Sequence, residues 1–164
     1  MIYGSYEGVY SYKNKNKNKN NDNKNYIILP YFKKPVFTGI KWECIEFVRR
    51  FFILKKGLTF QSVENVYNMI FIKFFICIYH HTLYNVHFYH INENIIPKKY
   101  DIILLFDDTT GHTGIITKYD RINRIIYFID QNNEEWEDKD YSKKISIEDN
   151  NIIGFLRIKE MTSN

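Results

Sequence analysis

Four short runs of β-forming residues, separated by polar turns, recur along the chain after residue 100 and constrain its fold most strongly. We expect strands at 101–106, 112–119, 124–130 and 151–158. The polar residues Asp120–Asn123 predict a tight turn between the second and third runs. Consecutive strands that are not separated by helices favour an antiparallel sheet.

The first half of the chain has the helical spacing of apolar residues instead. From Glu43 to Lys55 the apolar residues recur at intervals of three and four, and Gly57 supplies a stop. A second helical pattern runs from about Ser62 to about Ile78 and would pack across the first. Helices followed by strands predict an α+β domain, with N-terminal helices packed on an antiparallel β-sheet.

A chain of 164 residues can form one compact core but is short for two domains. We therefore expect a single domain over residues 1–164. The most apolar stretch, Met69–Tyr79, has about half the length of a bilayer span and contains Lys73. We therefore expect a buried helix there and no membrane partner.

A Lys/Asn-rich tract at about residues 13–25 carries a good part of the basic excess behind the net charge of +4. A basic arm of this kind can hold phosphates by releasing counterions. The tract has no arginine and no interleaved aromatic residues, which favours a solvated, disordered insertion. We expect no nucleic-acid partner.

Residues 80–100 show no clean periodicity, and we expect an irregular connection there. Four of the five histidines fall in this stretch, which makes a zinc site the alternative interpretation. No cysteine stands at ligand spacing, and no His-x3-His pair falls on a clear helix. We therefore expect no metal and no cofactor.

The two cysteines differ in their surroundings. Two cysteines are too few for a disulfide framework, and the chain does not start with the charged-then-apolar pattern of a signal peptide, so we expect a cytoplasmic protein.

Cys77 lies in an apolar run and is expected to be an inert core residue. Cys44 falls in the first turn of the first predicted helix, where unpaired N–H groups and the helix dipole favour a thiolate. A lone cysteine in an apolar helix is more often a core residue, so a nucleophilic Cys44 requires a base.

A base and an acid come from the predicted hairpin. His112 begins one strand and Asp130 ends the next. Counted from the turn, the two residues are nearly opposed, where cross-strand neighbours are about 5 Å apart. A histidine can take a thiol proton and a carboxylate can orient the histidine. The pattern predicts Cys44 as nucleophile, His112 as base and Asp130 as orienting acid.

These residues lie in segments that resemble a known family. Gly39–Phe51 is similar to the nucleophile helix of CHAP-type cysteine amidases, above all that of the amidase domain of glutathionylspermidine synthetase/amidase and trypanothione synthetase. Further matching segments cover almost the whole chain in order: Tyr6–Ser11, Thr110–Ile116, Asp130–Asn132 and Ile153–Phe155. The nucleophile helix together with the histidine and acid segments carries most of the resemblance.

The resemblance implies a papain-like CHAP fold and a thiol amidohydrolase. Cys44 would attack the amide that joins the glycine carboxyl of glutathione to spermidine, and His112, oriented by Asp130, would protonate the departing amine. Water activated by His112 would then hydrolyse the Cys44 acyl-enzyme and release glutathione. The backbone N–H of Cys44 is the expected oxyanion donor.

The resemblance also implies contacts to the substrate, a small-molecule glutathione–polyamine conjugate. Arg49 matches a residue that binds the anionic glutathionyl part, with a surface salt bridge as the alternative. Asn132 matches a polar contact near the acid. Glu43 stands beside the nucleophile where the family usually has Gln, and bears on substrate preference. A further substrate-contacting segment is matched by Val63, Glu64, Asn65 and Val66.

Two other functions stay open at this point. A catalytic set does not define a substrate, so a CHAP peptidase or amidase that cleaves another peptide amide is one of them. The other is an inactive binding module with the same fold, suggested by Glu43 and by a longer turn between His112 and Asp130. No synthetase portion follows residue 164, so we expect a separate synthetase protein or domain to make the conjugate.

Overall fold

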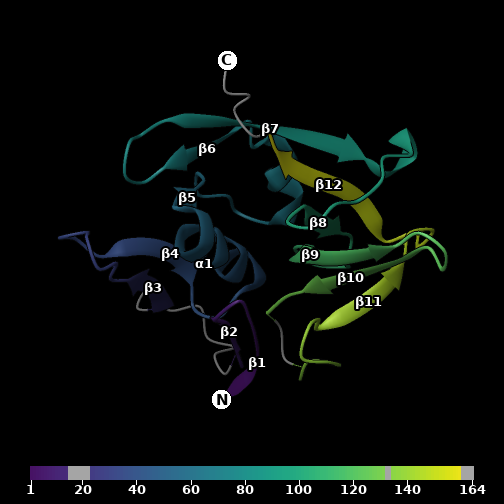
Figure 1. Ribbon diagram of the computed structural model, residues 1–164, viewed down its shortest axis with the longest axis horizontal. Coiled ribbons are helices and arrows are strands. Elements are labelled where there is room, and N and C mark those ends of the chain that lie inside the picture. The colour runs from purple at the N-terminus through teal and green to yellow at the C-terminus, as the bar shows by residue number, and fades with distance from the viewer. Residues whose placement is uncertain (15–22, 132–133, 160–164) are drawn as a thin grey trace.

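An eight-stranded antiparallel sheet forms most of the protein in the computed structural model, which describes residues 1–14, 23–131 and 134–159 (Figure 1). Its strand order is β11-β10-β9-β8-β12-β7-β6-β5, and two further pairs, β1-β2 and β3-β4, stand beside it. The elements are β1 (Ile2–Tyr6), β2 (Val9–Tyr12), β3 (Lys24–Ile27), β4 (Val36–Ile40), α1 (Cys44–Lys56), β5 (Leu58–Thr59), the 3-10 helix η2 (Val66–Phe71), β6 (Phe74–Cys77), β7 (Leu83–His90), the 3-10 helix η3 (Ile91–Glu93), β8 (Ile102–Leu105), β9 (His112–Asp120), β10 (Ile125–Ile129), β11 (Lys143–Ser146) and β12 (Ile152–Ile158).

The predicted helix at 43–55 is confirmed as α1. It buries one face, on which Phe47, Phe51 and Phe52 are almost inaccessible to solvent. The helix ends at Gly57, which has a left-handed conformation (φ 64°) and whose N–H reaches the carbonyls of Phe52 and Ile53. A glycine at this position closes a helix without a Cβ clash.

The second predicted helix, at 62–78, is wrong. The chain forms only the short η2 there and then the strand β6. Asn65 caps η2 by accepting a hydrogen bond from the Asn68 N–H. From Phe74 onward burial alternates, with Phe75 and Cys77 inside and Phe74 46% exposed, which is the period of a strand. The expected arrangement of several N-terminal helices packed on the sheet is therefore wrong, and the general α+β class holds with a single α-helix among the described residues.

The irregular connection expected at 80–100 is also wrong. This stretch contains β7, which has eight residues and is exceeded in length by β9. Burial alternates along β7: Tyr84, Val86 and Phe88 pack against the core, whereas the residues between them are exposed. Asn85 and His87 occupy the outward positions between them, so the inward apolar residues recur at every second position, as in a strand with one buried face.

The four predicted strands after residue 100 are confirmed as β8, β9, β10 and β12, while β11 was not predicted. Their antiparallel pairing was predicted too. The end of the expected Lys/Asn insertion needs correction, because Lys24 and Asn25 belong to β3 and Asn25 is buried. The middle of that tract, 15–22, lies outside the described residues.

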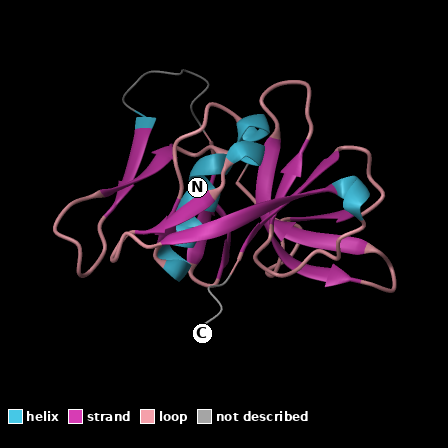
Figure 2. Ribbon diagram, turned by 90° about the horizontal axis from the view of Figure 1, so that it is seen from above, coloured by secondary structure: helices cyan, strands magenta, loops and turns pink. Residues whose placement is uncertain are grey.

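The main core lies between α1 and the sheet. It joins the buried face of α1 to inward residues of β6, β8, β9 and β12. A second apolar cluster, with Ile103, Ile116 and Phe128 at its centre, covers the opposite side of β8–β10. The β3-β4 pair lies at the end of the molecule opposite β11 (Figures 1 and 2). None of the helices in the described ranges has the length and apolar character needed to cross a bilayer.

Candidate active site

Cys44 is the first residue of α1. Glu43 precedes it in an extended conformation, and its side chain does not cap the helix. The first N–H groups of a helix have no carbonyl partner within it, so they can receive a negative charge. The Cys44 side chain is partly buried at this end of the helix, which is where the sequence placed it.

His112 begins β9 directly after a loop that Asp107 holds together. The Asp107 carboxylate accepts hydrogen bonds from the Thr109 N–H (2.8 Å), the Thr109 hydroxyl (3.0 Å) and the Gly111 N–H (2.8 Å). Burial alone would raise the pKa of Asp107, but these bonds and the nearby His112 lower it. Gly111 has φ 78°, and an added Cβ would lie 2.8 Å from Cβ of Val66. The loop therefore fixes where His112 enters the sheet.

His112 and Asp130 meet across the β9-β10 hairpin. The Nε2 atom of His112 lies 2.6 Å from Oδ2 of Asp130, and the Asp130 side chain is only 1% exposed. The predicted register is wrong by two residues. After a bulge, Ile129 pairs with Ile115, which puts Gly114 opposite Asp130. His112 lies two residues before Gly114 on β9, so its contact with Asp130 is diagonal. Diagonal neighbours are still within reach of a long side chain. The pair therefore forms, by a different register from the one expected.

Gly114, opposite Asp130, makes this diagonal contact possible. A methyl group on Gly114 would lie 2.5 Å from the Ile129 carbonyl oxygen and 3.2 Å from Cβ of Asp130. Only a residue without a side chain lets the end of β10 come this close.

We predict that Gly114→Ala pushes the end of β10 away and separates Asp130 from His112. Overpacking of this kind costs about 1–3 kcal/mol of unfolding free energy. Urea unfolding should show that loss, and turnover in the same sample should fall by more than the unfolded fraction explains. Wild-type stability with wild-type turnover would contradict the positioning role.

The Cys44 thiol is the second partner of His112. Burial would lower the pKa of His112, but hydrogen bonds to Asp130 and Cys44 and the charges of both outweigh it and raise the pKa to about 10. Because Nε2 faces Asp130, Nδ1 is the ring nitrogen available to the thiol. The three residues chosen from the sequence are thus brought together in the order Cys44, His112, Asp130.

A buried polar network beneath Cys44 ties α1 to the rest of the site. Its centre is the Glu46 carboxylate, 1% exposed. One oxygen accepts hydrogen bonds from Asn25 (2.9 Å), Thr38 (2.8 Å) and Arg50 (2.8 Å). The other oxygen accepts from Arg50 (3.3 Å) and Gln131 (2.9 Å). A buried carboxylate with this many donors holds α1 in one orientation.

Gln131 links the network to the acid. It directly follows Asp130, and its Nε2 donates to the Glu43 carbonyl at 3.2 Å while its Oε1 accepts from the Tyr12 N–H at 2.8 Å. Glu46, Arg50 and Gln131 were not predicted as site residues. The i,i+4 spacing of Glu46 and Arg50 inside an apolar helix is the signal that could have identified these two, and Gln131 has no such signal.

The β1-β2 hairpin braces the backbone of Asp130. The Asp130 carbonyl accepts hydrogen bonds from the Ser11 hydroxyl (3.0 Å) and from Trp136 Nε1 (3.3 Å). Gly4 lies directly against the Trp136 ring, where a Cβ does not fit. The N-terminal segment thus supports the acid from outside the sheet.

Arg49 is buried, with 3% of its surface exposed. Its three guanidinium nitrogens donate to the carbonyls of Phe60 (3.3 Å), Thr38 (2.8 Å) and Gln61 (3.1 Å). Burial lowers the pKa of Arg49 to about 10, although Glu46 opposes the shift. These contacts make Arg49 a brace between β4 and the 60–61 segment and do not present it to a ligand.

The other predicted substrate residues lie around the site. Val66 is buried, and its N–H donates to the Thr110 carbonyl at 3.0 Å, which places the 63–66 segment beside the loop that carries His112. Within that segment Val63 packs on the core, Glu64 is exposed and Asn65 caps η2. Glu43 is exposed next to Cys44. Asn132 lies outside the described residues.

His80 and His81 lie in an exposed turn, His87 lies on the outer face of β7, and His90 is the last residue of that strand. His90 caps η3 by accepting a hydrogen bond from the Asn92 N–H. Within the described ranges, no three His, Cys, Asp or Glu side chains converge as metal ligands would. The second cysteine, Cys77, is buried in β6, as predicted.

Comparisons with known proteins do not identify the site. No protein-family model matches the chain, and no curated protein matches it either. The chemistry of the site therefore rests on its geometry: a thiol at a helix start, an imidazole in contact with it, and a buried carboxylate on the far ring nitrogen. This combination is suited to nucleophilic attack on a carbonyl carbon.

Proposed function

We propose that the protein is a CHAP-type cysteine amidase that hydrolyses the amide between glutathione and spermidine, or a closely similar glutathione–polyamine conjugate. The observation that carries this proposal is the chain of contacts from Cys44 to His112 to Asp130. The sequence resemblance to the amidase domain of glutathionylspermidine synthetase/amidase supplies the substrate class. We propose that the protein resembles papain in the placement of these three residues. The thiol lies at a helix start, and the histidine and the acid lie at the ends of adjacent strands.

In the acylation step the Cys44 sulfur attacks the amide carbonyl carbon. A His112 with a raised pKa holds a proton at neutral pH, which suits a thiolate–imidazolium pair. The imidazolium then gives its proton to the departing amine nitrogen as the C–N bond breaks. The products of this step are a glutathionyl thioester on Cys44 and the free polyamine.

In the deacylation step neutral His112 takes a proton from water, which attacks the thioester carbonyl and releases glutathione. Both steps form a tetrahedral oxyanion beside the start of α1. The Cys44 N–H, unpaired within the helix, is placed to donate to this oxyanion. The reaction uses water and three side chains and needs no cofactor.

Acidic side chains around the site support a polyamine as the leaving group. Glu43 adjoins Cys44, Glu64 lies in the segment that contacts the His112 loop, and Asp107 and Asp108 lie in that loop. Three of these four carboxylates are exposed, and Asp107 is half-buried. A cationic amine chain leaving past this rim gains electrostatic attraction along its length.

We predict that the double variant Glu64→Gln/Asp108→Asn binds the polyamine conjugate more weakly. Exposed charge pairs contribute little each, so KM should rise by about threefold to tenfold with kcat almost unchanged. The control is Glu148→Gln, an exposed carboxylate paired with Arg124 at the opposite end of the β9-β10 hairpin. Equal kinetics in both variants would show that the rim does not contact the substrate.

Incubation of the purified protein with glutathionylspermidine tests the proposal. We expect release of glutathione and spermidine, and a mass increase on Cys44 that matches a glutathionyl acyl group. Release of glutathione without any Cys44 adduct would contradict the covalent route. A Cys44 adduct with another peptide amide, but none with the conjugate, would reject the polyamine substrate and leave amidase chemistry.

A further inference from the structure

A cavity of about 850 Å³ lies beside the C-terminal end of α1. Its wall includes four lysines and one arginine, against one acidic residue, Asp101. Cavities of about 300–1,000 Å³ are the size that small-molecule ligands occupy. The cavity is therefore large enough for a ligand and strongly biased toward one sign of charge.

The cavity is remote from Cys44. Cys44 is the first residue of α1 and Lys56, on the cavity wall, is the last. At 1.5 Å of rise per residue the two lie about 18 Å apart. The carboxylates of Glu43, Glu64, Asp107 and Asp108 form an acidic rim around the N-terminal end of α1, so the two ends of the helix differ in charge. A cationic polyamine suits the Cys44 end and is repelled at the other.

The cations come from three separate parts of the chain. Lys56 ends α1, Lys98 and Lys99 precede β8, and Arg157 and Lys159 lie at the end of β12. One lysine at the last turn of α1 is explained by the helix dipole. The dipole does not explain the convergence of the other four.

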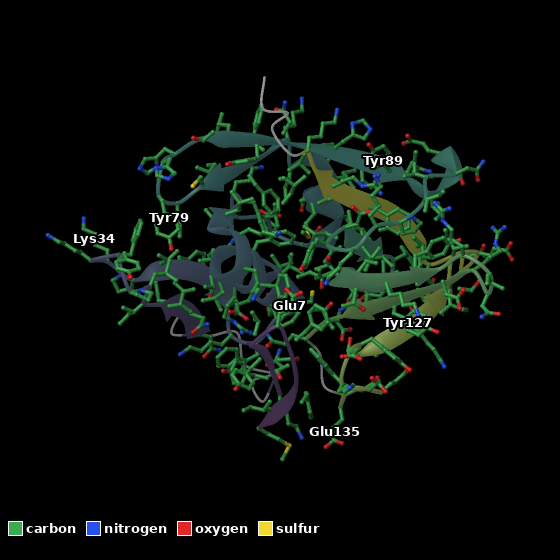
Figure 3. The ribbon with its side chains drawn as sticks, in the orientation of Figure 1. Glu7, Lys34, Tyr79, Tyr89, Tyr127 and Glu135 are labelled. Carbon is green, nitrogen blue, oxygen red and sulfur yellow. The ribbon has the colours of Figure 1, made fainter. Side chains whose placement is uncertain are left out.

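Internal pairing neutralises only part of this charge. Arg157 is bound by Asp101 through two contacts, at 2.8 and 2.6 Å. Lys99 lies 3.2 Å from Glu7, which Figure 3 shows at the β1-β2 turn beside α1. The other three ammonium groups of the wall have no carboxylate partner in the described part of the chain; they belong to Lys56, Lys98 and Lys159.

An aromatic ring keeps two of the ammonium groups in place. Lys56 Nζ lies 4.6 Å from the centroid of the Tyr100 ring, and Lys99 Nζ lies 4.9 Å from it. The Tyr100 hydroxyl donates to Glu7, so the ring itself is fixed. Cation–π contacts of this kind order lysine side chains before a ligand arrives.

We propose that this cavity binds a small molecule that carries two or more phosphate groups. A concave wall of one charge sign concentrates oppositely charged ligands, and lysine ammonium groups donate strong hydrogen bonds to phosphate oxygens. A bound polyanion also removes the repulsion among the converging lysines. Tyr84, partly exposed on the same wall, offers a flat apolar surface for a ring attached to the phosphates.

Isothermal titration calorimetry with the full chain tests this proposal, using ATP, inorganic tripolyphosphate and adenosine as probes. We expect ATP and tripolyphosphate to bind at one site per chain and adenosine not to bind. Lys98→Glu/Lys159→Glu should weaken binding by about tenfold or more, because attraction is replaced by repulsion. Cys44→Ala should bind as the wild type does, which separates this site from amidase activity.

The matched control is Lys34→Glu/Lys144→Glu, which changes the net charge equally on two exposed residues far from the cavity (Figure 3 shows Lys34). We expect an effect below about twofold, since salt screens distant charges. Tighter binding of ATP than of tripolyphosphate would show that the adenine ring also contacts the cavity. Equal binding would show that the phosphates alone provide the affinity. Absence of saturable binding, binding of adenosine alone, or equal losses in both double variants would overturn the proposal.

Discussion

Replacing Cys44 with alanine is expected to abolish amide hydrolysis, with kcat/KM falling by about 10⁴-fold or more. The reason is that every covalent step passes through the Cys44 sulfur, and neither His112 nor water can replace it as a nucleophile in this geometry. The measurement is glutathione release from glutathionylspermidine, with mass spectrometry for the acyl adduct. The side chain is small and only partly buried, so the fold should persist.

The matched control for this loss is Cys77→Ala. Cys77 is the other cysteine, buried in β6, which β8, β12 and β7 separate from β9 in the sheet order. We expect it to reduce stability slightly through a small cavity and to leave turnover intact. Retention of substantial activity by Cys44→Ala, or equal losses in the two variants, would contradict Cys44 as the nucleophile.

The second large effect is expected for Asp130→Asn. The substitution keeps the shape of the side chain but removes the charge that fixes the His112 ring, so we expect kcat to fall by about 10²–10⁴-fold. Asp120→Asn, at the exposed turn of the same hairpin, is the matched control and should have little effect. Comparable activity in the two variants would remove Asp130 from the site.

The pH profile of Asp130→Asn gives a separate test. The hydrogen bond to Asp130, together with Cys44, raises the pKa of His112 from 6.5 to about 10. Activity that requires imidazolium should therefore decline as pH rises through about 10, and in Asp130→Asn this decline should move to lower pH. The same pKa shift stabilises the folded protein fully below pH 6.5, and that contribution is lost as pH rises toward 10. An unchanged alkaline limb would mean that Asp130 does not act on His112.

The elements predicted well from the sequence are those with uninterrupted periodicity. The helix α1 and the strands β8, β9, β10 and β12 each have a continuous apolar pattern and a clear stop, such as Gly57. The wrong predictions concern strands of which only one face is buried. In β7 the outward residues Asn85 and His87 masked the apolar pattern, and in β6 a run of apolar residues satisfied a helical and a strand pattern equally.

The site was predicted in its chemistry more than in its geometry. His112 and Asp130 were chosen for their places at the ends of two strands, and the structure joins them through a bulge and a diagonal contact that the count of residues did not predict. The partners that hold α1 were missed because Glu46, Arg50 and Gln131 interact through the fold, over separations of up to 85 residues. Arg49 was assigned to a ligand because the sequence does not show that backbone carbonyls surround it.

The central claim is that His112 activates Cys44, and the rate of alkylation of Cys44 by iodoacetamide between pH 6 and pH 9 tests it most directly. Iodoacetamide reacts with thiolate, and peptide mapping separates Cys44 from the buried Cys77 in the same sample. We predict that Cys44 is alkylated much faster in the wild type than in His112→Ala, because a protonated His112 beside the sulfur favours the thiolate. Identical alkylation profiles for Cys44 in the wild type and in His112→Ala would contradict the claim.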